Sequence, residues 1–215
     1  NVTGVQTCAL PISTDSMIII VLNSVLQKFG GPDQGDILIT CATIVQSFMM
    51  LITGPMLGIS SGTQAILSYN YGAKEIRRVK KAEKYILILC LCFTTLMFIL
   101  SRIVPQYFIH IFTKDPVQLE LCTWGIGVFT LMIVPLSFQY VFVDGFTALG
   151  RSKTALFLSL ARKGNYMLFT ILLPIFFGAK SAFYAQPLAD GIAAVMSTIG
   201  FLLLFNKHLE KRENS

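Results

Sequence analysis

One uninterrupted stretch, ILITCATIVQSFMMLITGPMLGISSGTQAILSYNYGA, runs from Ile37 to Ala73 and decides the class of fold. It holds 37 residues without a single Asp, Glu, Lys or Arg. A membrane-spanning helix needs about 20 predominantly apolar residues, so this stretch can hold one long helix and a polar turn. The stretch shows no alternation of period two. A segment inside a bilayer must also satisfy its own backbone hydrogen bonds, which favours a helix over an open strand.

The composition of the whole chain agrees with a membrane protein. Of its 215 residues, 54% are apolar and only 13% are charged, whereas about a quarter of an ordinary soluble domain is charged. The mean hydropathy is +0.68. These values exclude a disordered chain, a coiled coil and an ordinary soluble domain. At about 20 residues per span, the length allows about six spans joined by short loops.

Further uncharged runs come after the first at intervals that suit a polytopic membrane protein. The clearest are Tyr85–Ser101, Leu121–Val143, Gly164–Ala179 and Gly191–Asn206. Extended by the mixed residues that flank them, these runs predict an all-α, six-helix membrane bundle. The six predicted helices cover residues 16–29, 36–60, 82–103, 117–149, 153–177 and 182–207.

The first 13 residues, NVTGVQTCALPIS, do not match the rest of the chain. They have no basic segment and no long apolar core, so they do not form a signal peptide. The segment resembles a translated sequencing-adapter scar. We therefore predict that residues 1–13 are not native and that the six-helix bundle occupies residues 14–215, with its first helix truncated.

Lysine and arginine are distributed unevenly between the two ends of the predicted helices. One end collects 13 of the 17, in residues 74–84, 151–163 and 207–212, and the other end has Lys28, Arg102, Lys114 and Lys180. Cytoplasmic loops carry the excess of basic residues. The pattern predicts a multi-pass protein of the plasma (inner) membrane with a cytoplasmic carboxyl terminus. Because the basic residues flank apolar runs, we expect contact with membrane lipids and no nucleic-acid partner.

The sequence offers no basis for a metal, a cofactor or catalysis. Four of the five cysteines lie inside apolar runs, where they are expected to act as small hydrophobic residues. The two histidines, His110 and His208, have no partner in the sequence pattern. An enzyme would need a cluster of His, Asp or Ser at one depth, and none is apparent. We therefore expect no metal site, no cofactor and no enzyme activity.

A polar break interrupts the apolar sequence at Tyr69, Asn70, Tyr71, Gly72 and Ala73. Gly72 is the expected left-handed residue that ends the helix. The basic cluster after it can bind the phosphates of inner-leaflet lipids. The alternative is a solvated loop that only obeys the orientation rule.

Two acidic residues lie inside predicted spans, where a charge is costly and by default a candidate for function. Asp144 has Tyr140 one turn before it, and Asp190 has Gln186 one turn before it. We expect the stripe through Asp190 to face the bundle interior. The functional interpretation makes these residues part of a substrate or cation pathway. The structural interpretation pairs the acids with Arg162 or with the neighbouring Tyr and Gln.

Arg162 is a cation about ten residues inside the fifth predicted helix, and Asn165 lies on the same face as a further pathway candidate. The chain reverses near Arg151. At about 1.5 Å per residue, Asp144 and Arg162 then lie at comparable depth on adjacent antiparallel helices. An unpaired buried charge is expensive. We therefore predict that Asp144 neutralises Arg162, directly or through Tyr140. The alternative is that Arg162 reaches the lipid phosphates.

Four segments together resemble a known family. They are GISSGTQAILSYNYGAKEIRRVKKA at 58–82, FTKDPVQL at 112–119, GFTALGRSKTALFLSLARK at 145–163 and FFGAKSAFYAQPLAD at 176–190. In order and spacing they closely resemble the carboxyl-terminal half of multidrug and toxic compound extrusion (MATE) transporters. The resemblance covers residues 17 to about 207.

The resemblance implies a half-transporter. Members have twelve helices in two six-helix halves around a central cavity, and they export amphipathic cationic compounds in exchange for Na⁺ or H⁺. The expected partners are the missing amino-terminal half, lipids and small-molecule substrates, with Na⁺ or H⁺ as the coupling ion. In the branch that this chain most resembles, the main coupling carboxylates lie in the other half. Two alternatives stay open: a flippase-type exporter of lipid-linked oligosaccharides with the same broad architecture, and a membrane scaffold that does not transport.

Overall fold

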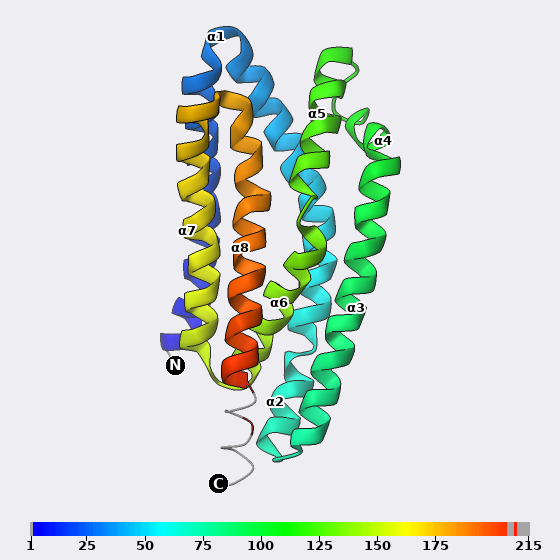
Figure 1. The fold of residues 1–215 in the computed structure, drawn as a ribbon, viewed down its shortest axis with the longest axis vertical. Helices are drawn as coiled ribbons and strands as arrows, with labels where there is room; N and C mark the ends of the chain where they lie inside the picture. The colour runs from blue at the N-terminus through cyan, green and yellow to red at the C-terminus, as the bar shows by residue number, and fades with distance from the viewer. Residues whose placement is uncertain (1, 206–208, 210–215) are drawn as a thin grey trace.

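The computed structural model describes residues 2–205 and Leu209, with the backbone alone for residues 2–15 and 33. This described part contains helices and no strand (Figure 1). The predicted all-α membrane bundle is therefore confirmed. The segment that we predicted to be non-native is helical from Val2 and continuous with the first helix. Its origin stays a prediction.

The first helix, α1 (Val2–Gly62), consists of two arms that fold back on each other at Gly31. Gly31 has φ 71° and ψ −174°, a backbone conformation that L side chains rarely adopt. The first arm begins well before the predicted residue 16. The second arm continues past the predicted residue 60, through Thr63, into α2 (Gln64–Gly72). The uncharged run at 37–73 is thus helical along nearly its whole length.

The next predicted span, residues 82–103, is α3 (Ile76–Ile103), which begins six residues earlier than expected. A short α4 (Pro105–Ile109) comes after it. The predicted single helix at 117–149 is wrong: it is divided into α5 (Pro116–Phe129) and α6 (Ile133–Ala148), bent by 47°. Pro135 explains the break, because its nitrogen cannot donate to the carbonyl of Leu131 and its ring crowds the preceding turn.

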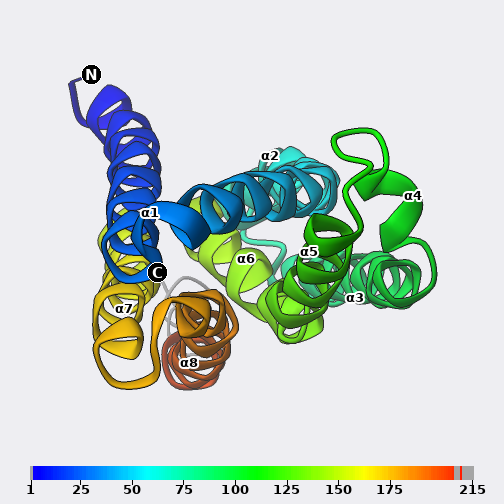
Figure 2. The same ribbon diagram turned by 90° about the horizontal axis from the view of Figure 1, so that it is seen from above.

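The last two predicted helices form an antiparallel pair. The fifth is α7 (Ser152–Phe177), close to the predicted 153–177. The sixth is built from η1 (Ala179–Tyr184), α8 (Ala185–Gly200) and η2 (Phe201–Phe205). Seen from above, α7, α8 and the first arm of α1 stand on one side, and α3, α4 and α5 stand on the other (Figure 2).

Length and composition identify three described helical segments that can cross a membrane: residues 34–72, 76–103 and 179–205. A fourth span results if the bent pair α5 and α6 crosses as one unit. The first arm of α1 and the whole of α7 do not meet these criteria. In α7 the cause includes Arg162 and Lys163 in the middle of the helix. These two residues mark the region where the apolar character of the bundle is interrupted.

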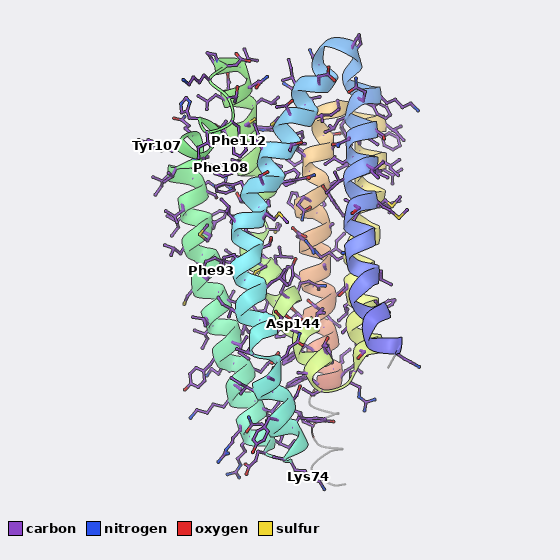
Figure 3. All side chains as sticks on the ribbon, turned by 180° about the vertical axis from the view of Figure 1, so that it is seen from behind. Lys74, Phe93, Tyr107, Phe108, Phe112 and Asp144 are labelled. Carbon is purple, nitrogen blue, oxygen red and sulfur yellow. The ribbon has the colours of Figure 1, made fainter. Side chains whose placement is uncertain are left out.

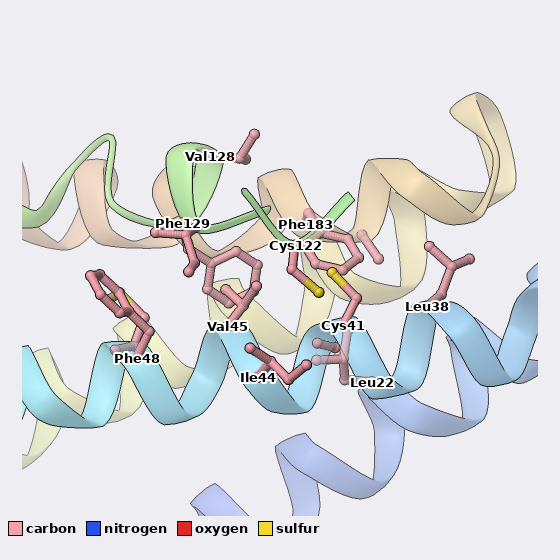
Figure 4. Close-up of a cluster of buried hydrophobic side chains, with 14 of the residues drawn as sticks. Leu22, Leu38, Cys41, Ile44, Val45, Phe48, Cys122, Val128, Phe129 and Phe183 are labelled. Atoms are coloured by element: carbon pink, nitrogen blue, oxygen red, sulfur yellow. The ribbon is translucent and has the colours of Figure 1, made fainter. Parts of the chain in front are cut away.

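Three of the described cysteines, Cys41, Cys90 and Cys122, lie in the core as the sequence predicted, whereas Cys92 is exposed. Cys41 on α1 and Cys122 on α5 are fully buried among Val45, Phe129 and Phe183 (Figure 4). Both are free thiols. A second apolar cluster packs α3, α6 and α2 together at the opposite end of the bundle, around Met56, Leu67, Val79, Leu136 and Phe146.

Candidate functional site

A buried polar network connects α6, α7 and α8. The Arg162 Nε donates to Asp190 Oδ1 at 2.8 Å, and its Nη1 donates to the Tyr140 hydroxyl at 3.3 Å. Gln186 Nε2 donates to the other Asp190 oxygen at 2.8 Å. The Asp190 side chain is 1% exposed and that of Arg162 is 19% exposed. The ion pair is therefore largely buried inside the bundle. Each carboxylate oxygen of Asp190 accepts a hydrogen bond.

Helical periodicity brings Asp190 into the interior. Asp190, Ala193 and Ser197 lie three or four residues apart on α8, and all three are buried. Residues at this spacing share one helix face. Small side chains at Ala189 and Ala193 allow α8 to pack closely. The expectation that the stripe through Asp190 faces the bundle interior is thus confirmed.

The network forms part of the wall of a cavity of about 400 Å³ that lies between the two arms of α1 and helices α6, α7 and α8, with Phe129 at the end of α5. The wall combines apolar, aromatic, polar and basic side chains. It is lined by Ile18, Ile19, Gln46, Met49, Met50, Thr53, Gly54, Leu57, Phe129, Tyr140, Arg162, Lys163, Tyr166 and Gln186. Among the predicted pathway residues, Tyr140 and Gln186 contribute directly. Asp190 lies behind Arg162 and does not line the cavity.

The predicted ion pair between Asp144 and Arg162 is wrong. Asp144 Oδ2 accepts from Ser60 Oγ at 2.5 Å, and Oδ1 accepts from Gln64 Nε2 at 2.8 Å. Asp144 therefore faces α1 and α2, whereas Arg162 is paired with Asp190 on α8. The predicted depth was not enough to identify the partner, because the directions in which the side chains leave their helices decide which groups meet. The alternative, in which Arg162 reaches lipid phosphates, is also not what the structure shows.

Asn165 lies on α7, three residues after Arg162. It is half-buried and is not among the residues that line the cavity. Asp144 does not line the cavity either. The structure thus brings Asp190, Gln186, Tyr140 and Arg162 together, whereas Asp144 is bound by Ser60 and Gln64.

The sequence analysis missed a third acid inside the bundle, Glu83 on α3. Its side chain is 3% exposed, and neither carboxylate oxygen has a hydrogen-bond partner within the described part of the chain. The carboxyl group lies against the backbone of Gly145, where an added Cβ would be 2.5 Å from Oε1. The signal was a spacing of three or four residues within the buried stripe of α3, which comprises Ile76, Val79, Glu83, Ile86, Cys90 and Thr94. Lys80, Lys81 and Lys84 flank Glu83, so the segment resembles a solvent-exposed basic loop and the spacing is hard to recognise.

The predicted helix end at the polar break needs one correction. Gly72 does not adopt the left-handed conformation; Lys74 does, with φ 60°. The Glu75 amide donates to the Asn70 carbonyl at 2.9 Å and the Lys74 amide donates to the Tyr71 carbonyl at 3.2 Å. This pair of bonds is a Schellman motif. It satisfies the last carbonyls of α2 and shifts the left-handed position two residues beyond Gly72.

The turns between α2 and α3 and between α6 and α7 lie at the same end of the bundle (Figure 1). Lys74 marks this end, and Tyr107, Phe108 and Phe112 lie near the opposite end (Figure 3). The basic turns that contain Lys74 and Arg151 therefore lie at one end, as predicted, whereas Arg162 and Lys163, which we assigned to the same set, lie in the middle of α7. The predicted basic segment at 207–212 lies outside the described residues. Within the described residues, no group of three or more His, Cys, Asp or Glu side chains is placed to hold a metal ion.

Solved structures of transporters share the fold of this chain. A structure described as MATE in the bent conformation has a TM-score of 0.87 at 16% identity, over 98% of this chain and 46% of that chain. An outward-facing multidrug resistance MATE family transporter of the MOP superfamily has a TM-score of 0.84 at 16% identity, over the same 98% and 46%. A MOP superfamily transporter from Pyrococcus furiosus, described as having a binding pocket of reverse polarity, has a TM-score of 0.84 at 16% identity over 94% and 45%.

The chain therefore spans about half the length of the structures that it matches. At these identities the structural likeness concerns the fold alone. A comparison with curated proteins gave no significant match. The family model MatE, however, matches residues 11–172, which is most of the chain. The helical membrane fold and this match together show that the chain belongs to the MatE family of transporters.

Proposed function

We propose that this chain is the carboxyl-terminal half of an antiporter that exports amphipathic cationic compounds in exchange for Na⁺ or H⁺. The proposal is supported by the MatE match and by coverage of about half of the solved transporters. Alternating access needs two bundles that move against each other around a central site. On this proposal the amino-terminal half supplies the second bundle, the protein resides in the plasma membrane with a cytoplasmic carboxyl terminus, and it is not an enzyme.

The observation that carries the proposal is the cavity beside the Arg162–Asp190 pair. Its volume of about 400 Å³ lies in the range of small-molecule sites, which run from about 300 to 1,000 Å³. Met49 and Met50 offer flexible, polarizable surfaces, and Tyr166 offers an aromatic ring. A wall of this kind suits an amphipathic ligand. Gln186 adds a polar group that fixes orientation.

The charge of the cavity wall constrains how a cation would bind. The lining includes Arg162 and Lys163, and it includes no carboxylate from the described residues. The Asp190 charge compensates Arg162 from behind. In this half, a cationic substrate would therefore contact aromatic faces and thioethers. We propose that the carboxylates that attract it lie on the amino-terminal half.

The same lining favours a second candidate function, the export of an anionic or lipid-linked compound. Two basic side chains on one wall can bind a phosphate or a carboxylate. The flippase alternative needs a cavity of this kind. The two candidates differ in the sign of the substrate charge, which one position can test.

Met50 is suited to this test because it lines the cavity and is 76% exposed. The complete protein carrying Met50→Lys, Met50→Glu or the neutral control Met50→Gln would be reconstituted in vesicles. Uptake of a cationic dye and of an anionic dye would then be measured under Na⁺ and pH gradients. A charge at roughly 10 Å contributes about 1.7 kcal/mol at an effective dielectric constant of 20, which corresponds to an affinity change of more than about tenfold.

Under the first proposal, Met50→Lys weakens transport of the cationic dye and Met50→Glu preserves or improves it. Under the second proposal, Met50→Glu weakens transport of the anionic dye and Met50→Lys preserves or improves it. Equal transport of both dyes by all three variants, at equal expression, would contradict the assignment of this cavity to the substrate path. The gradient that drives uptake identifies the coupling ion.

A further inference from the structure

Glu83 lies outside the cavity and its function is not explained by the Arg162–Asp190 network. It precedes the uncharged run of α3 by two residues and packs against α6. Both carboxylate oxygens are buried without a hydrogen-bond donor from the described residues. A buried ionised carboxylate without a partner is strongly unfavourable, and in practice such a group becomes neutral.

The described groups around Glu83 do not neutralise it. On α6 the nearest charge is Asp144, whose negative charge repels that of Glu83. On α3 the exposed Lys80 and Lys84 lie three residues before Glu83 and one residue after it, but neither carboxylate oxygen of Glu83 accepts a hydrogen bond from them. The buried Cys90 lies further along the same face of α3, and Tyr71 of α2 packs against the apolar cluster that contains Cys90. Ser60 of α1 and Gln64 of α2 donate to Asp144. Lys207, His208, Lys211 and Arg212 are outside the described residues.

The space around the Glu83 carboxyl group limits which cation can bind there. A Cβ placed on Gly145 would be 2.5 Å from Glu83 Oε1 and 3.1 Å from Oε2 and Cδ. The carboxyl group therefore contacts the backbone of α6 directly. A metal cation needs several oxygen ligands and room for a coordination shell, whereas a proton needs neither. Glu83 lines none of the three cavities next to Arg102, Gln34 or Tyr166.

We propose that Glu83 is a proton-binding site, and that its neutral carboxylic acid forms the contact between α3 and α6 while Asp144 stays ionised on Ser60 and Gln64. Of the two acids, Asp144 is the one with two donors, so it is the one that stays ionised. Glu83 has none, so it holds the proton. Loss of that proton places a second negative charge beside Asp144 and favours separation of α3 from α6. The site is independent of the substrate cavity and does not depend on the proposed export function.

Infrared difference spectroscopy on the purified complete protein tests the proposal. The carbonyl stretch of a protonated carboxylic acid would be recorded at about pH 6, where an ordinary Glu, with a pKa of about 4.3, is already ionised. The wild type is expected to show the band, and Glu83→Gln is expected to lose it. Glu120→Gln, which removes an exposed carboxyl group on α5, is the matched control and is expected to keep the band.

Stability against pH provides a second measurement. If the folded protein holds a proton on Glu83 that the unfolded chain releases, stability must fall as pH rises. Glu83→Gln imitates the neutral acid, so its denaturation temperature is expected to change less between about pH 6 and pH 9 than that of the wild type or of Glu120→Gln. A band that survives in Glu83→Gln, or equal pH dependence in all three proteins, would overturn the proposal.

Discussion

Replacing Asp190 by Asn tests whether the buried network depends on its ion pair. The substitution keeps the size of the side chain and removes its charge. Gln186 can still donate to the remaining oxygen, but the guanidinium of Arg162 loses its only ion-pair partner among the described residues. The complete protein is therefore expected to unfold more easily, because the arginine is left charged in a mostly buried position.

The expected size depends on the burial of the two partners. Removing one member of a buried pair typically costs about 3–5 kcal/mol. Arg162 retains 19% exposure and its bond to the Tyr140 hydroxyl, so we expect the lower end of that range, about 3 kcal/mol. Arg162→Gln should also lower the stability of the protein, because it leaves the Asp190 carboxylate, which is only 1% exposed, without its ion-pair partner.

A double-mutant cycle separates the pair from its surroundings. The free energy of unfolding would be measured in detergent for Asp190→Asn, Arg162→Gln and the double variant. Contacting residues show interaction energies of about 0.5–3 kcal/mol, and we expect about 2 kcal/mol for this pair. The matched cycle of Asp144→Asn with Arg162→Gln should give less than about 0.5 kcal/mol, because Asp144 is bound by Ser60 and Gln64.

The reasoning would be refuted by the reverse order of the two coupling energies. Coupling near zero between Asp190 and Arg162 would mean that the pair contributes no specific stability. Strong coupling between Asp144 and Arg162 would restore the pairing expected from depth alone. Loss of transport in Asp190→Asn at unchanged stability would instead give Asp190 a direct role in the substrate pathway.

The remaining predictions concern the Asp144 site, the helix end at Lys74 and the orientation of the bundle. Ser60→Ala removes a donor to half-buried Asp144 and should cost about 1–3 kcal/mol in unfolding free energy. The exposed Ser61 hydroxyl donates to the Leu57 carbonyl of its own helix, so Ser61→Ala should stay within about 0.5 kcal/mol. Lys74→Gly should raise unfolding stability by about 1 kcal/mol, because Lys74 occupies a left-handed position; a decrease would contradict the role of the motif. An impermeant thiol reagent on intact cells should label Lys114→Cys and not Lys74→Cys, in a background without other cysteines; the opposite result would reverse the orientation.

The sequence by itself determined the class of fold, because the requirement for apolar residues over a membrane span acts locally and can be counted along the chain. The run at 37–73 was identified for this reason, and the helix at 153–177 was identified by extending the shorter uncharged run at 164–179. The break near Pro135 could not be predicted by counting apolar residues. Whether a proline bends a helix or divides it depends on how the neighbouring helices pack against it. The run at 121–143 therefore suggested one helix where Pro135 divides two.

The candidate site was only partly determined by sequence. The spacing of Gln186 and Asp190 fixed their shared face, and the costliness of charge in a span drew attention to Arg162. Which acid pairs with Arg162 was decided by the tertiary structure. The sequence predicts the depth of each residue along its helix, but it does not predict toward which neighbouring helix the side chain points. Glu83 was hidden for the same reason: a basic local sequence indicates solvent, and only the packing of α3 against Gly145 buries the carboxyl group.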